Sequence, residues 1–181
     1  DGPRHMIGTA AYPTPDDLKG VRMRVPPVET WLKTFEPMGV AATTVEAAEV
    51  YSALSQGVVT AAEAPLTGIR ASGWHEPVKE ITLTGHFNLF LGWVMSDAAF
   101  QQISEADRAI LLEEFRKGGQ NLTKQSIDLE SGIRAEFESK GVTFHEADVE
   151  AYRAATAGFY KSFPNWPEGL YEQVRAAATG N

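Results

Sequence analysis

The pattern of apolar and polar positions changes its period along the first part of the chain. Residues 21–25 alternate between apolar side chains and arginines, which is typical of a half-buried strand. Residues 28–38 instead place large apolar side chains at helical spacing, and Gly39 is suited to end that helix. Strands that alternate with helices in this way predict an α/β fold.

The same criteria predict elements along the rest of the chain. We expect strands at residues 5–11, 21–25, 41–45, from 58 onward and 142–145. We expect helices at residues 28–38, 47–56, 65–73, 104–140, 148–162 and 167–179, and the glycines at 118–119 could kink or split the longest. The apolar segment 80–96 predicts either one long buried strand or two strands broken at Gly85.

Composition narrows the class of protein. The 181 residues suffice for one domain, and 43% hydrophobic with 22% charged residues is typical of soluble globular proteins. The net charge of -8, without a basic cluster, argues against a nucleic-acid partner. Cysteine is absent, which excludes disulfides and thiolate metal sites. No apolar run approaches the about 20 residues of a membrane helix.

Candidate chemistry is sparse. The four histidines lack metal-ligand spacing, and the sequence has no P-loop, GxGxxG, GxSxG or HExxH motif. We therefore assign no catalytic residue, no metal ligand and no cofactor. Arg24 is the exception, because it stands at a strand end just before Val25 and Pro26. Its planar fork can hold a carboxylate through two hydrogen bonds, although a lone strand arginine is more often a surface group.

Several short motifs with fixed intervals surround Arg24. They are DLKG at 17–20, MRVP at 23–26, EVY at 49–51, QGVV at 56–59 and LTGH at 83–86. Together, over residues 14–96, they resemble the substrate-binding proteins of TRAP (tripartite ATP-independent periplasmic) transporters, which capture organic acids. The resemblance implies a periplasmic binding protein-like α/β fold, with two lobes that close over a ligand.

The resemblance also implies particular ligand contacts. Arg24 matches the arginine that clamps the ligand carboxylate, and Arg4, twenty residues earlier, matches a second ligand arginine. Three positions depart from the family: Pro27 replaces a common asparagine, Ala47 an aromatic residue of acid-sugar binders, and Ala64 a ligand-contacting asparagine. The carboxylate clamp is therefore retained, whereas the polar set that selects sugar acids is not.

These departures lead to an expectation about the ligand. We expect an organic acid whose far end meets a less polar or roomier wall than in the acid-sugar binders. The alternative is that a large neighbouring side chain, such as Trp31 or Phe90, fills the space and keeps the pocket small.

The matching region corresponds only to the later part of the family, so we expect a whole first lobe to be missing from this chain. Residues 1–87 and 130–181 are expected to form the second lobe, and residues 88–129 to belong largely to the first. The first six residues, Asp1 to Met6, are interpreted as natural rather than as a cloning remnant, because Arg4 then falls in the family register.

The resulting functional hypothesis is a periplasmic substrate-binding component that delivers an organic acid to TRAP membrane subunits, without catalysis. The missing lobe would be supplied by another chain or by exchange in a dimer. Two alternatives stay open: a truncated fragment or interaction domain without ligand binding, and an enzyme on a related two-lobed scaffold.

Overall fold

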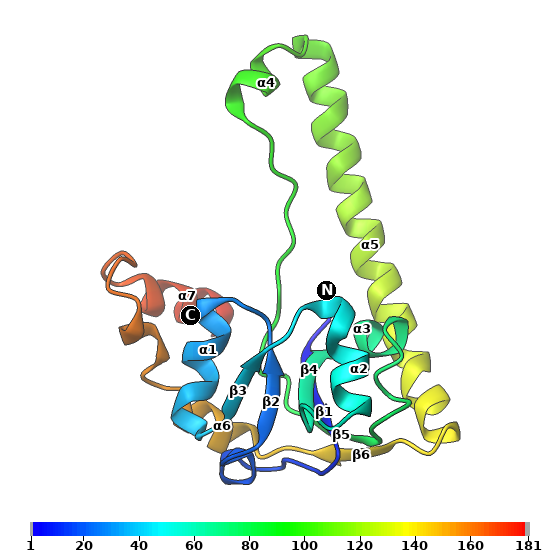
Figure 1. The fold of residues 1–181 in the computed structure, drawn as a ribbon. Helices are drawn as coiled ribbons and strands as arrows, with labels where there is room; N and C mark the ends of the chain where they lie inside the picture. The colour runs from blue at the N-terminus through cyan, green and yellow to red at the C-terminus, as the bar shows by residue number, and fades with distance from the viewer. Residues whose placement is uncertain (1, 180–181) are drawn as a thin grey trace.

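The computed structural model describes residues 2–179. Asp1, the first of the six residues expected to be native sequence rather than a cloning remnant, lies outside this range. A six-stranded mixed sheet with the order β3-β2-β4-β1-β5-β6 forms its centre (Figure 1). The strands are β1 (Arg4–Gly8), β2 (Arg22–Val25), β3 (Ala41–Thr44), β4 (Ala61–Pro65), β5 (Glu80–Leu83) and β6 (Thr143–Glu146). Only β1 runs antiparallel to its neighbours, β4 and β5. The carboxyl ends of β2, β3 and β4 therefore meet at the edge where β1 begins.

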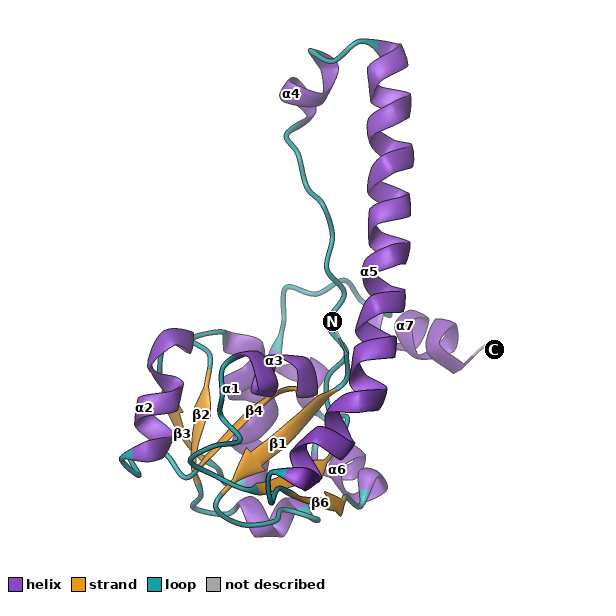
Figure 2. Ribbon diagram, turned by 90° about the vertical axis from the view of Figure 1, so that its right-hand side faces the viewer, coloured by secondary structure: helices purple, strands orange, loops and turns teal. Residues whose placement is uncertain are grey.

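Helices surround the sheet (Figure 2). The α-helices are α1 (Glu29–Phe35), α2 (Val50–Ser55), α3 (Leu66–Ala71), α4 (Asp97–Gln101), α5 (Glu105–Ser139), α6 (Val149–Ala155) and α7 (Leu170–Thr179). Short 3-10 helices lie at η1 (Pro15–Leu18), η2 (Glu36–Met38), η3 (Ala47–Glu49) and η4 (Phe159–Ser162).

Alternation along β1 divides the core into two layers, because successive strand residues face opposite sides of a sheet. Met6 packs with Phe35 of α1 and Tyr152 of α6 on one face. Ile7 packs with Phe137 of α5 on the other face, together with residues of α2 and α3. The sheet is thus covered on both sides, and α5 contributes only its carboxyl-terminal part to this core.

The rest of α5 rises away from the sheet, together with α4 and the segment that leads into it (Figures 1 and 2). Ile133 and Phe137 are the buried residues of this helix among those described. The helix continues through Gly118 and Gly119 without interruption, so the expected split is absent. Ser104 caps its amino terminus, since the Ser104 hydroxyl accepts a hydrogen bond from the backbone N–H of Asp107 at 3.2 Å.

Neither alternative for residues 80–96, one long buried strand or two strands broken at Gly85, is correct, because only residues 80–83 form a strand. β5 ends at Leu83, Gly85 adopts a positive φ of 54°, and a single isolated bridge joins Asn88 to Pro3. Beyond that bridge the side chains are open to solvent, with Phe90 96% and Val94 97% exposed. The apolar sequence of this segment reflects a surface that the described chain does not cover.

The strand expected from Val58 begins later, at Ala61. The backbone N–H groups of Val58 and Val59 both bond to the carbonyl of Ala53, at 2.9 and 3.3 Å, so these residues complete the end of α2. Gly57, with a φ of 69°, permits that return of the chain. The expected helix at 148–162 also stops early, at Ala155, and η4 replaces its second half.

Candidate functional site

Arg24 lies near the end of β2, at the edge where the parallel strands finish. Its side chain is buried, with 5% exposure, although it carries a charge. Arg24 Nε donates a hydrogen bond to the Val45 carbonyl at 2.8 Å, and its guanidinium carbon lies 6.0 Å from the centre of the Trp74 ring. Among residues 2–179, no carboxylate oxygen lies within 4.0 Å of this guanidinium. Arg24 is therefore held in place without an ionic partner.

The surroundings of Arg24 weaken its hold on the proton. Burial is the main cause that lowers the pKa of Arg24, and the positive charge of Arg4 acts in the same direction. The carboxylates of Glu63 and Glu46 oppose this effect but do not cancel it. Since arginine keeps its proton in proteins, Arg24 is a buried cation that a nearby anion would stabilise.

Arg4 is in a different situation, because it forms a buried ion pair. Arg4 Nε donates to Glu63 Oε2 at 2.5 Å, and Arg4 Nη2 donates to Glu63 Oε1 at 2.9 Å. The same Nη2 also donates to the Glu63 carbonyl at 3.1 Å. Glu63 is fully buried in β4, with 0% exposure. The charge of Arg4 is thus already balanced within the lobe.

Two further side chains complete the environment of Glu63. Trp31 Nε1, from α1, donates to Glu63 Oε1 at 2.8 Å, and His86 Nε2 lies 3.3 Å from Glu63 Oε2. Burial alone would raise the pKa of Glu63, but the hydrogen bonds from His86 and Arg4, with the charges of both groups, hold the pKa below its ordinary value. Glu63 therefore stays ionised.

The two arginines approach this edge from opposite faces of the sheet. Arg24 shares its face with Trp74 and Ala64, which belong to the core layer of α2 and α3. Arg4 lies with Glu63 and Trp31 on the side of α1. Alternation along the strands produces this separation, yet the two groups remain close enough for Arg4 to lower the pKa of Arg24.

The three positions that depart from the family lie along the same edge. Pro27 follows β2, Ala47 is the first residue of η3 after β3, and Ala64 is the second-last residue of β4. Pro27 and Ala47 are exposed, whereas Ala64 is only 4% exposed and packs in the core. The structure therefore groups these positions near Arg24 by topology.

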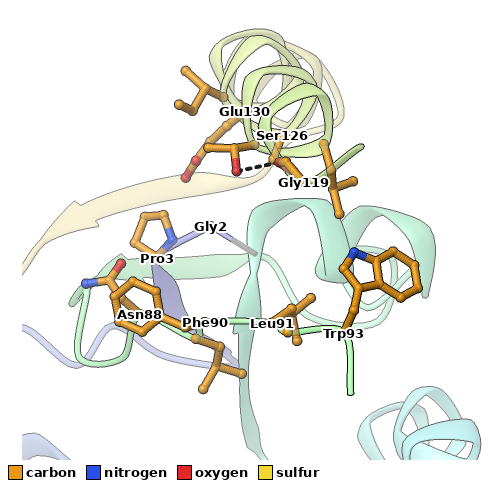
Figure 3. A pocket seen from close by; sticks show the side chains of 14 residues that line it. Gly2, Pro3, Asn88, Phe90, Leu91, Trp93, Gly119, Ser126 and Glu130 are labelled. Carbon is orange, nitrogen blue, oxygen red and sulfur yellow. Dashed lines mark hydrogen bonds between the residues drawn. The ribbon is translucent and has the colours of Figure 1, made fainter. Parts of the chain in front are cut away.

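Phe90, in contrast, lies away from Arg24. It lines an open cavity of about 700 Å³ between residues 88–93 and α5, to which Ser126 and Glu130 also contribute (Figure 3). Neither Arg24 nor Arg4 lines this cavity. Trp31, the other side chain expected to fill space, instead packs against Phe87 and bonds to Glu63.

Sequence reasoning did not assign roles to Glu63, Trp31 and His86. The sequence carries a signal for Glu63, because this carboxylate stands among alanines in a strand whose five residues are all buried. A carboxylate in such a strand requires a buried cationic or hydrogen-bonding partner. His86 belongs to a set of histidines without metal-ligand spacing, and its partner Glu63 could not be identified without the fold.

The fold and the site together define a chain of the periplasmic binding protein class. The family model for DctP, the bacterial extracellular solute-binding protein family 7, matches residues 1–165. The chain belongs to this family, and its fold class is the expected periplasmic binding protein-like α/β fold.

Similar proteins agree with this assignment. A solute-binding protein from Verminephrobacter eiseniae is 30% identical over 98% of this chain and 54% of its own length. A TRAP periplasmic solute-binding protein from Fusobacterium nucleatum, with bound sn-glycerol-3-phosphate, has a TM-score of 0.87 at 29% identity, covering 99% of this chain and 58% of that one. A second TRAP periplasmic solute-binding protein, from Actinobacillus succinogenes with bound L-galactonate, has a TM-score of 0.86 at 26% identity. The match covers 99% of this chain and 60% of that one.

The chain spans about half the length of the curated relatives it matches. No helix within the described residues is both long and apolar enough to cross a membrane. Within the same residues, no group of three or more histidine, cysteine, aspartate or glutamate side chains could hold a metal ion.

Proposed function

We propose that this chain is the second lobe of a TRAP solute-binding protein, and that it binds a small organic acid in the periplasm for uptake. The observation that carries the proposal is Arg24: a buried guanidinium, fixed through Nε by the Val45 carbonyl and by the Trp74 ring, without a carboxylate partner in the described chain. A ligand carboxylate would supply the missing anion through a bidentate contact. Arg4 would be the secondary contact, from the other face of the sheet.

The family membership supports transport over catalysis, because the matched family model and the similar structures are solute-binding proteins. Their bound molecules include a sugar acid and a glycerol phosphate, so the class of anion varies among relatives. We propose a carboxylate here, delivered to TRAP membrane subunits, with neither a cofactor nor a metal ion required.

The binding test is calorimetric titration of the full-length protein that carries this chain, after a thermal-shift panel of organic acids has identified a ligand. Arg24→Ala should weaken binding at least about thirtyfold, since a desolvated carboxylate without its partner costs about 2–5 kcal/mol. Arg24→Lys should also bind poorly, because an ammonium cannot form two parallel hydrogen bonds.

Arg22 provides the matched control. It lies two residues earlier on β2 but is exposed, and its guanidinium bonds to the carbonyls of Val58 and Gly57. Arg22→Ala should therefore leave affinity within about threefold of the unmodified protein. Near-normal affinity in Arg24→Ala would refute the assignment of the carboxylate ligand.

The positions near Arg24 bear on the rest of the ligand. Ala64, Ala47 and Pro27 offer neither a hydrogen-bonding side chain nor an aromatic face at the edge of the sheet. A polyhydroxylated ligand would therefore lose hydrogen bonds that water had satisfied. We propose that aliphatic or aromatic acids and keto acids raise the melting temperature in the panel more than uronates or sialic acid do. Selective stabilisation by sugar acids would overturn this part.

The exposed apolar surface supports a further part of the proposal, which is that residues 88–129 pack against a first lobe. Segment 89–95 and the outer part of α5 expose large apolar side chains, listed as Phe90, Leu91, Trp93, Val94, Met95, Ile110, Leu112, Leu122 and Ile127. Apolar surface of this extent usually contacts a partner. We propose that residues 88–129 pack with a first lobe, which is supplied by the same full-length protein, by another chain or by exchange between two copies.

A further inference from the structure

The charges around the site limit the charge of its ligand. Resting on the proposed function, we infer that this site accepts one negative charge, so that the ligand is a monoanion and a second carboxylate or a phosphate dianion is disfavoured. The inference depends on which of the two arginines has its charge balanced within the described chain.

Arg4 contributes no net charge toward a ligand. Glu63 is fully buried and meets Arg4 at two oxygen–nitrogen contacts of 2.5 and 2.9 Å, the geometry of a bidentate ion pair. Trp31 adds a neutral hydrogen bond to the same carboxylate, and His86 Nε2 lies 3.3 Å from Glu63 Oε2. Because the pair is desolvated, an incoming anion cannot displace Glu63 without leaving a buried carboxylate unpaired.

Arg24 is then the cation that remains uncompensated at close range. Within the described residues, its side chain contacts a neutral carbonyl, that of Val45, and the neutral ring of Trp74. The nearby carboxylates act on it only through space: Glu63 is committed to Arg4, and Glu46 is exposed. One ligand carboxylate neutralises Arg24, and a second negative charge would face Glu63 without a cation of its own from this lobe.

Matched acids that differ by one charge test the inference. Calorimetry on the full-length protein would compare each diacid with its monoamide at pH 7.5: succinate with succinamate, adipate with adipamate, and terephthalate with 4-carbamoylbenzoate. In the pair that binds most tightly, the monoamide should bind at least tenfold more tightly than the diacid. Equal or tighter binding of the diacid would overturn the inference while leaving the proposed function intact. Failure of every acid in these pairs and in the thermal-shift panel to bind would overturn both.

A charge variant tests the cause of the selectivity. Glu63→Gln keeps the side-chain shape and oxygen acceptor but removes the charge that balances Arg4. The preference for monoamide over diacid should then fall at least fivefold, mainly because the diacid gains affinity. Glu46→Gln is the matched control, since Glu46 is exposed and screened by solvent, and it should change the preference less than twofold. An unchanged preference in a folded Glu63→Gln protein would refute the charge-balance argument, and if that variant does not fold, the comparison of acids on the unmodified protein still decides.

Discussion

His5 provides a sharp test of the electrostatics beneath the site. It lies on β1 beside Arg4, with 7% exposure, and its Nδ1 accepts a hydrogen bond from the Gly85 backbone N–H at 3.2 Å. A neutral ring with an unprotonated Nδ1 can accept this hydrogen bond. In a protonated ring, the Nδ1–H group would instead face the N–H of Gly85. Burial, aided by the charge of His86, lowers the pKa of His5 from 6.5 to about 4.

The sign of the effect on stability follows from the two pKa values. Between pH 6.5 and about 4 the unfolded chain binds a proton at this histidine and the folded chain does not. The free energy of unfolding therefore falls as the pH drops through this range, and His5 has no effect above it. At about 1.4 kcal/mol per tenfold change, the whole loss is about 3 kcal/mol, of which about 2 kcal/mol falls between pH 6.5 and 5.

Urea unfolding of the chain at pH 7 and pH 5 measures this loss. His5→Asn should retain an acceptor for Gly85 but cannot titrate, so its loss of stability between these pH values should be about 2 kcal/mol smaller than that of the unmodified protein. Burial also lowers the pKa of His75, so the difference between variants is the diagnostic quantity. An equal loss in His5→Asn and the unmodified protein would refute the reasoning.

Three further predictions concern the ion pair, the packing and the exposed surface. Arg4→Ala should weaken ligand binding less than Arg24→Ala, yet lower the free energy of unfolding by about 3–5 kcal/mol, because it strands the buried Glu63 carboxylate; urea unfolding and calorimetry separate the two effects. Tyr152→Phe removes a hydroxyl that donates to the Tyr12 carbonyl at 2.6 Å, and should cost about 1–3 kcal/mol in the same assay, whereas a cost near zero would contradict that bond. The 181-residue chain should associate in sedimentation experiments, and a monodisperse monomer would count against the proposed partner lobe.

The regular elements were largely predictable from the sequence, since each carries a local signal. Alternation over residues 21–25 corresponds to β2, and helical spacing over residues 104–140 corresponds to α5. The errors occur where a local signal competes with a contact. The β-branched pair at 58–59 favours a strand, but the glycine before it lets both backbone N–H groups return to α2.

The apolar segment 80–96 shows a second limit. Its apolar composition favoured burial throughout, whereas the structure buries only its first part, and Phe90 and Val94 are 96% and 97% exposed. In the described chain, residues 80–83 form β5, Asn88 bridges to Pro3, and residues 90–95 are exposed. Local hydrophobicity therefore predicted a buried strand over residues that the described chain leaves exposed.

The site shows why the motif alone was not enough. The resemblance marked Arg24 as the arginine that clamps the ligand carboxylate and Arg4 as a second ligand arginine, so both were treated as cations available to a ligand. The pairing of β1 with β4 opposes Arg4 to Pro65 and brings it to Glu63, while alternation on β2 turns Arg24 to the other face. The charge that a ligand meets thus depends on strand pairing between residues about sixty positions apart, which no local pattern encodes. That pairing balances the charge of Arg4 and leaves Arg24 as the cation that we propose anchors the ligand.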